Sequence, residues 1–99
     1  MAQQPADRIT PEKLAKYFAI TREALALAEQ HVNQTRLEHA SDALDMVRRY
    51  VSDAEHFRSD DDIVNAFAAL NYAHGWLDCG ARTGLFTVKD SRLFTVDDE

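Results

Sequence analysis

Residues 12–74 contain neither glycine nor proline, and this constrains the fold more than any other feature of the sequence. The only prolines and glycines are Pro5, Pro11, Gly75, Gly80 and Gly84. A stretch this long, rich in Ala, Leu, Arg and Glu, favours helices and lacks the turn residues that a many-stranded β fold uses. Because the chain has 99 residues, it has room for one small domain. We therefore expect an all-α protein.

The first two helices are predicted from hydrophobic periodicity. Thr10 is a typical N-cap residue, and Pro11 is tolerated in the first turn because a backbone N–H has no helical partner there. Apolar side chains then recur at helical spacing and predict a helix over about residues 11–33, with its main seam at Leu14, Phe18, Thr21, Leu25, Ala28 and Val32. The pattern restarts in a new phase after a polar break and predicts a second helix over about residues 36–58.

A third helix is predicted over about residues 62–80, after an acidic turn at residues 59–62 and before glycines that can terminate it. Its core seam is Ile63, Ala66, Phe67, Leu70, Ala73 and Leu77. Three helices with short connections favour an antiparallel up-down-up three-helix bundle, which we place at residues 10–84. Residues 1–9 are expected to form a disordered N-terminus, and residues 85–99 a C-terminal tail.

The tail contains the same tetrapeptide, Leu-Phe-Thr-Val, at residues 85–88 and 93–96. One interpretation is a β-hairpin in which the two tetrapeptides pair across a polar turn, although such a hairpin is marginally stable alone and must dock on the bundle. The other is an extended tail whose phenylalanines, Phe86 and Phe94, pack on the third helix. The sequence favours neither interpretation over the other.

Charge and cysteine content limit the classes of function. The net charge of −6 repels phosphate backbones, so nucleic-acid binding is disfavoured. Cys79 is the only cysteine, which excludes an intramolecular disulfide or a Cys-rich zinc site and favours the reducing cytoplasm.

The polar N-terminus lacks the apolar region of a secretion signal, and no apolar run is long enough to cross a membrane. No phosphate-binding loop or catalytic motif occurs, and we predict neither a cofactor nor a metal site.

Apolar side chains lie on two opposite faces of the predicted third helix. Besides the core seam, Tyr72 and Trp76 occupy the far side, where a three-helix bundle should present polar residues to water. Either the tail folds over these side chains or another subunit covers them. A second apolar seam on the first helix contains Tyr17, Ile20 and Leu27. We predict that these five residues form the contact surface of a non-catalytic interaction or scaffold module, which forms a homodimer through the third helix or binds another protein.

An alternative function is enzymatic. Arg49 and His56 share the outer face of the second helix at a spacing that fits the loose Arg-x(4 to 6)-His pattern of helical ribonucleases of the HEPN type. In such an enzyme the histidine acts in general acid–base catalysis and the arginine stabilises charge on the phosphate. The spacing arises readily by chance, and the net charge opposes RNA. An ordinary solvated Arg and His are therefore favoured, with a HEPN-like ribonuclease or nucleotide-binding protein as the alternative.

His74 and Asp78 are a second polar pair, four residues apart on the third helix, where their side chains can meet. Together with Asp42 and Asp45 of the second helix they would suit a divalent cation. The carboxylates of the second helix, however, are expected to point outward. We therefore predict a structural pair, in which Asp78 orients His74 beside the core or caps the end of the third helix.

Three segments of the sequence resemble a known family. They are Tyr50–Phe57, Asn65–Gly80, which includes the distinctive run Tyr-Ala-His-Gly-Trp-Leu-Asp, and Gly84–Phe86. On these residues the chain is similar, over roughly residues 12–86, to the archaeal domain-of-unknown-function family numbered 357. The resemblance implies a small cytoplasmic archaeal protein of helical-bundle form, and it implies no activity. The tail beyond Phe86 extends past the family pattern.

Overall fold

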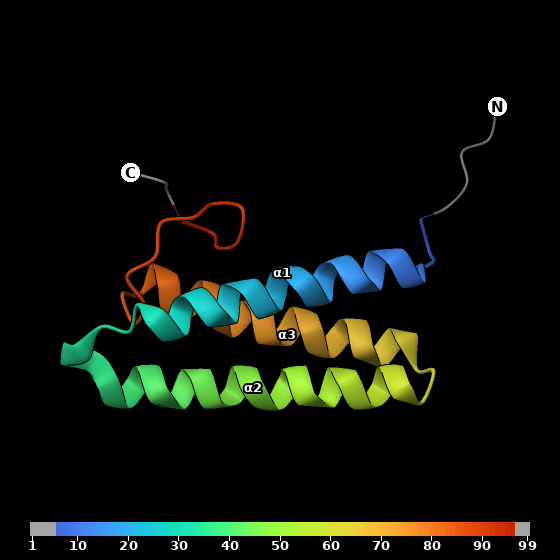
Figure 1. Ribbon diagram of the computed structural model, residues 1–99, viewed down its shortest axis with the longest axis horizontal. Helices are drawn as coiled ribbons and strands as arrows, with labels where there is room; N and C mark the ends of the chain where they lie inside the picture. Colours follow the sequence, from blue (N-terminus) through green and yellow to red (C-terminus); the bar gives the residue numbers. More distant parts are fainter. Residues whose placement is uncertain (1–5, 97–99) are drawn as a thin grey trace.

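A computed structural model describes residues 6–96 of the chain (Figure 1). It contains three α-helices and a short 3-10 helix, which are α1 Pro11–Gln30, η1 Gln34–Arg36, α2 Leu37–Ser59 and α3 Ile63–Arg82. The α-helices run antiparallel, up-down-up, and the described residues contain no β-strand (Figure 1). The predicted all-α three-helix bundle is confirmed.

The predicted terminal segments are described in part. Residues 6–9 precede α1 without regular secondary structure, whereas the rest of the predicted disordered N-terminus, residues 1–5, lies outside the described residues. Residues 97–99 of the predicted tail also lie outside them.

Side-chain caps determine where α1 and α3 begin. The Thr10 hydroxyl accepts a hydrogen bond from the Lys13 backbone N–H at 3.1 Å, and Pro11 follows in the first turn as the sequence predicts. At the start of α3, the Asp62 carboxylate accepts a hydrogen bond from the Asn65 backbone N–H at 3.2 Å. Each cap satisfies a backbone donor that has no partner within the helix.

The first helix ends three residues earlier than predicted, at Gln30. The reason is that the next residues pair with the tail instead of continuing the helix. The Thr87 N–H donates to the His31 carbonyl, and the Asn33 N–H donates to the Leu85 carbonyl, both at 2.8 Å. A contact between distant parts of the chain therefore sets the end of α1.

The third helix continues through Gly80 to Arg82, two residues past its predicted end. Gly80 does not terminate the helix. Three ring atoms of Phe86 lie within 2.9 Å of the position that a Cβ atom at Gly80 would occupy, so the missing side chain makes room for this ring. After the helix ends, Gly84 has a left-handed conformation, with a φ of +81°, where the backbone reverses into the tail.

The central helix of the bundle is α3. It packs against both α1 and α2, whereas α1 and α2 contact each other much less (Figure 1). Two ion pairs, Arg22–Glu55 and Arg48–Glu29, join the edges of α1 and α2. The bundle is elongated and flat, with extents of 52 × 33 × 16 Å. Because its neighbours lie along two sides of α3, part of the circumference of α3 remains uncovered by the other helices.

The core consists of two clusters of buried side chains. The smaller cluster contains Leu14, Phe18, Ala54, Ala66 and Leu70. The larger cluster joins the helices to the tail, and its members include Ala28, Val47, Ala73, Leu77, Leu85, Phe86, Leu93 and Phe94. Buried alanines on facing helices leave the backbones free to approach closely. The tail is therefore part of the core.

The tail folds back on the bundle as an irregular loop. An isolated antiparallel bridge joins Phe86 to Val32, and a turn follows in which the Leu93 and Phe94 N–H groups donate to the Asp90 carbonyl at 3.1 and 2.9 Å. Of the two interpretations of the tail, the hairpin does not hold for the described residues, because the first tetrapeptide pairs with the segment after α1. The extended alternative is right in that Phe86 and Phe94 are both buried.

Candidate interaction surface on helix α3

One face of α3 is apolar and exposed. Val64 has 73% of its surface exposed and Tyr72 has 56%, although both are large apolar residues. Ala68, Gly75 and Cys79 are exposed on the same face at helical spacing. We call these five residues the α3 stripe. A helix with neighbours on its flanks normally presents polar side chains on the face that contacts water. The stripe is unusual because apolar residues occupy that face.

A shallow groove of about 370 Å³ lies along the stripe, lined by Asn71, Tyr72, Gly75, Trp76 and Cys79. Trp76 is half-buried and packs against the larger core cluster. The exposed Tyr72 ring is held against Tyr50 of α2, with the ring centroids 4.5 Å apart. No lining residue comes from the tail as far as the structure describes it. The groove is thus an open apolar feature with two aromatic residues in place.

Two of the three α1 residues predicted for this surface border the groove. Tyr17 and Ile20 line a narrower cleft of about 210 Å³ between α1 and α3, which shares Asn71 and Gly75 with the first groove. Leu27 lies further along α1 and lines clefts against the tail, one with Phe86 and Val88 and one with Leu93. The structure therefore brings Tyr17 and Ile20 close to the stripe and places Leu27 beside the tail.

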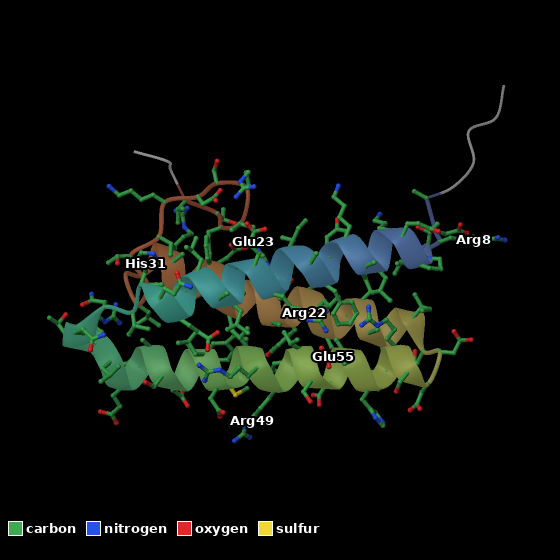
Figure 2. All side chains as sticks on the ribbon, viewed as in Figure 1. Arg8, Arg22, Glu23, His31, Arg49 and Glu55 are labelled. Atoms are coloured by element: carbon green, nitrogen blue, oxygen red, sulfur yellow. The ribbon has the colours of Figure 1, made fainter. Side chains whose placement is uncertain are left out.

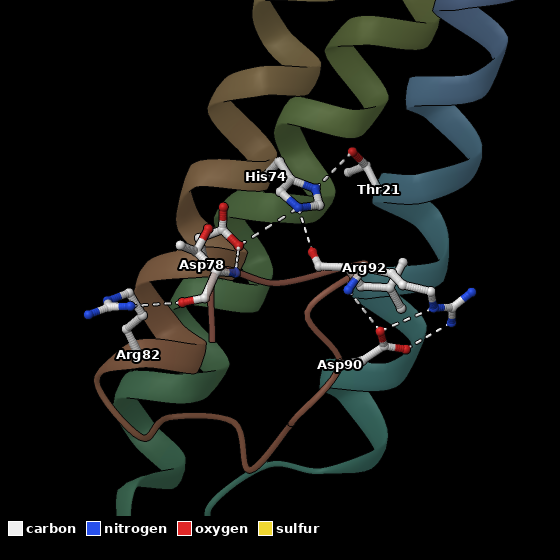
Figure 3. A network of polar contacts seen from close by, with 8 residues as sticks. Thr21, His74, Asp78, Arg82, Asp90 and Arg92 are labelled. Atoms are coloured by element: carbon white, nitrogen blue, oxygen red, sulfur yellow. Dashed lines mark hydrogen bonds and ion pairs between the residues drawn. The ribbon is translucent and has the colours of Figure 1, made fainter. Parts of the chain in front are cut away.

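A polar network around His74 holds the tail (Figure 3). His74 Nε2 lies 2.7 Å from the Leu93 carbonyl oxygen, and Nδ1 lies 3.2 Å from the Thr21 hydroxyl. A carbonyl oxygen only accepts, so Nε2 carries the donated proton and, in the neutral ring, Nδ1 accepts from Thr21. The Asp78 carboxylate accepts a hydrogen bond from the Thr95 N–H at 2.8 Å and lies 3.8 Å from His74 Nε2. We call these five residues the tail latch.

The pair of His74 and Asp78 thus joins α3 to the tail. Thr95 is a closer partner of Asp78 than His74 is, and Arg82 adds a hydrogen bond from its guanidinium to the Thr95 carbonyl at 3.0 Å. Within residues 6–96, no group of three or more His, Cys, Asp or Glu side chains could hold a metal ion. Asp45, considered for a metal site with this pair, instead forms an ion pair with Arg49 at 2.9 Å.

A charged cluster closes the loop of the tail. Arg92 contacts the Asp90 carboxylate at 2.8 Å and reaches Glu23 of α1 at 3.4 Å. The hydrogen bond from Arg92 stabilises the charged form of Asp90 and lowers the pKa of this carboxyl below its usual 3.8. The stabilisation that follows is therefore present above pH 3.8 and is lost as the pH falls through the lowered pKa. Because the Arg92 side chain is 72% exposed, solvent screens the pair and this contribution is small.

Arg49 and His56 lie on the outer face of α2 (Figure 2 labels Arg49). Their side chains are 71% and 73% exposed. Each lies beside an acid four residues away: Arg49 forms an ion pair with Asp45, and His56 Nε2 lies 3.3 Å from the Asp60 carboxylate. Such exposed contacts are ordinary features of a solvated helix surface. Nothing in their surroundings adds support for the ribonuclease alternative.

The tail latch leads to a prediction about His74. Replacing His74 with alanine is expected to lower the free energy of unfolding by about 1 kcal/mol, because the Leu93 carbonyl and the Thr21 hydroxyl lose their partner. Amide hydrogen exchange at residues 93–95 should accelerate more than exchange in the helices. His39→Ala, at an exposed position of α2, is the matched control and should change neither quantity. Equal effects of the two variants would mean that His74 does not hold the tail.

Comparisons with known proteins assign the chain to a family and to no activity. Within residues 6–96, none of the helices combines the length and the hydropathy that a membrane span requires. Neither the curated proteins nor the solved structures compared with the chain include a significant match. The model of a family described as "Protein of unknown function (DUF357)" matches residues 16–86. This range is well over half of the chain and includes all of α2 and α3. It also includes the segments on which the resemblance rests, so the chain belongs to this family of proteins of unknown function, DUF357.

Proposed function

We propose that this protein is a non-catalytic protein-interaction module that self-associates through the exposed face of α3. The observation that carries the proposal is the α3 stripe, together with the groove between Tyr72 and Trp76. An apolar face that the protein's own helices leave open is characteristic of a surface that binds a partner. Tyrosine and tryptophan side chains often dominate the energetics of such contacts, because they bury a large area at little cost in conformational entropy.

The partner that we propose is a second copy of the chain. Tyr72 projects from the face, and the groove is open beside it, since nothing lies within 4 Å of the Cβ position at Gly75. In a two-fold interface each copy contributes the same surface. A side chain that projects from this surface and the groove that receives it must therefore both lie on the same face of each copy. Tyr72 and the neighbouring groove meet this requirement, with each tyrosine entering the groove of the other copy.

We further propose that the module acts in the cytoplasm. The lone Cys79 has an exposed thiol at the edge of the groove, which supports a reducing compartment. Small domains of oxidising compartments usually carry paired cysteines, and this chain has a single one.

The mass of the protein in solution tests self-association. We expect light scattering of the wild type to approach twice the monomer mass as concentration rises. Tyr72→Asp should keep the monomer mass, because dimerisation would bury an unpaired carboxylate. Leu37→Asp is the matched control, since Leu37 is 50% exposed, lies at the start of α2 outside the stripe and gains the same charge.

The control should dimerise like the wild type, and circular dichroism should show that both variants are folded. A wild type that stays monomeric at every concentration would refute the proposal. So would a Tyr72→Asp variant that dimerises as well as Leu37→Asp does.

A further inference from the structure

The two ends of α3 carry opposite charges. The turn before the helix contains Asp60, Asp61 and Asp62, and the helix ends at Arg82. Asp60, Asp61 and Arg82 are all exposed. Arg82 uses one guanidinium N–H on the Thr95 carbonyl, and a guanidinium has five such donors. The uncharged stripe between these ends therefore has an acidic terminus and a basic terminus.

This polarity distinguishes the two ways in which a second α3 could lie along the stripe. In a parallel arrangement, Arg82 would face Arg82 and the acidic turn would face the acidic turn, so that like charges repel at both ends. In an antiparallel arrangement, Arg82 of each copy lies beside the acidic turn of the other, and unlike charges meet at both ends. Complementary charges of this kind determine the orientation of partners.

The apolar residues indicate the register of an antiparallel pair. When two copies of one helix pack antiparallel about a two-fold axis, moving up one helix means moving down the other. The numbers of two facing residues therefore always add up to the same value. When the stripe is centred on the axis, Val64 faces Cys79 of the second copy, and Tyr72 lies next to the axis. Ala68 then faces Gly75, so the small residues on either side of the axis leave room for the tyrosine rings and for close approach of the helices. The same register places Arg82 opposite the acidic turn that contains Asp61, although these charges were not used to choose the register.

We propose that the second copy binds with its α3 antiparallel to the first, with Tyr72 beside the two-fold axis and Arg82 of each copy next to Asp61 of the other. This inference rests on the proposed function, because it specifies the geometry of the same self-association. The apolar register and the charge pattern are independent observations, and both lead to this one arrangement.

The native Cys79 serves as the distance probe for the test. At 1.5 Å per residue, the antiparallel register separates the two Cys79 residues by about 22 Å, whereas a disulfide requires Cα atoms within about 7 Å. Mild oxidation is therefore expected to leave the wild type without a covalent dimer. Val64→Cys alters a side chain that is 73% exposed and places a thiol opposite Cys79. We expect most of this variant to become a covalent dimer, with peptide mass spectrometry showing the bond between residues 64 and 79.

The double variant Val64→Cys/Cys79→Ser retains one thiol per chain and is expected not to cross-link. Cross-linking of the wild type through Cys79, together with cross-linking of this double variant, would show a parallel pair and overturn the inference. A protein that is dimeric in light scattering but is not linked by Val64→Cys would overturn the register while leaving self-association intact. A wild type that is monomeric in light scattering would overturn the proposed function and this inference with it.

Discussion

Replacing Phe86 with alanine is expected to lower the free energy of unfolding by about 3–5 kcal/mol, because the change removes a buried aromatic ring from the larger core cluster. Phe86 is 1% exposed, and its ring packs over Gly80. In a domain of about 100 residues, each kcal/mol shifts the melting temperature by roughly 4–8 °C. Thermal unfolding followed by circular dichroism should therefore show a Tm lower by more than about 10 °C.

Two further variants show whether this loss reflects the packing of the tail. Leu37→Ala removes an apolar side chain that is 50% exposed and should change the stability by no more than about 0.5 kcal/mol. Phe94→Ala removes a side chain that is 3% exposed from the second tetrapeptide and should destabilise nearly as much as Phe86→Ala. If Phe86→Ala melts within a few degrees of Leu37→Ala, the tail is not part of the core.

The helices could be predicted from the sequence because their determinants are local. Leu14 and Phe18 of the first predicted seam and Leu70 and Leu77 of the third are all at most 1% exposed. Periodicity within one helix is sufficient to identify such residues, since each turn repeats the same geometry. The Thr10 cap likewise depends only on the residues that immediately follow it.

The path of the tail could not be predicted, because its contacts are distant in sequence. The two Leu-Phe-Thr-Val segments have the same local preference, yet Phe86 bridges to Val32 while Phe94 follows a turn at Asp90. The early end of α1 at Gln30 has the same cause, since the residues after it pair with the tail. Local propensity does not show which distant segment will satisfy a backbone hydrogen bond.

The candidate surface was predictable to the extent that it depends on one helix. Tyr72 and Trp76 follow from the helical projection of α3 alone, and the structure places both in the groove. Leu27 lies on a predicted apolar seam, but the position of the tail decides how exposed that seam is. Thr21 is the residue from which the tail latch could have been predicted. A hydroxyl within an apolar seam needs a hydrogen-bond partner, and here that partner is His74.

Gly80→Ala is expected to destabilise the protein by about 1–3 kcal/mol, although alanine is the better helix former. The new Cβ would lie within 2.9 Å of three ring atoms of Phe86, and this ring is buried and cannot move without disturbing its neighbours. Gly75 in the same helix is the matched control, since nothing lies within 4 Å of its Cβ position. In dilute solution Gly75→Ala should stabilise the protein by up to about 1 kcal/mol. Urea denaturation of both variants measures the difference.

A double-mutant cycle with Phe86→Ala separates the steric effect from the helical one. Once the ring is absent, Gly80→Ala should change from destabilising to neutral or stabilising by up to about 1 kcal/mol, because only the gain in helix propensity remains. Gly80 lies within α3, and the described residues with a positive φ are Asp61 and Gly84, so a need for left-handed backbone cannot explain a loss at this position. A Gly80→Ala effect of the same sign and size with and without the ring would contradict the packing of Phe86 on α3. A reversal of sign would show that Gly80 is there to admit the tail into the core.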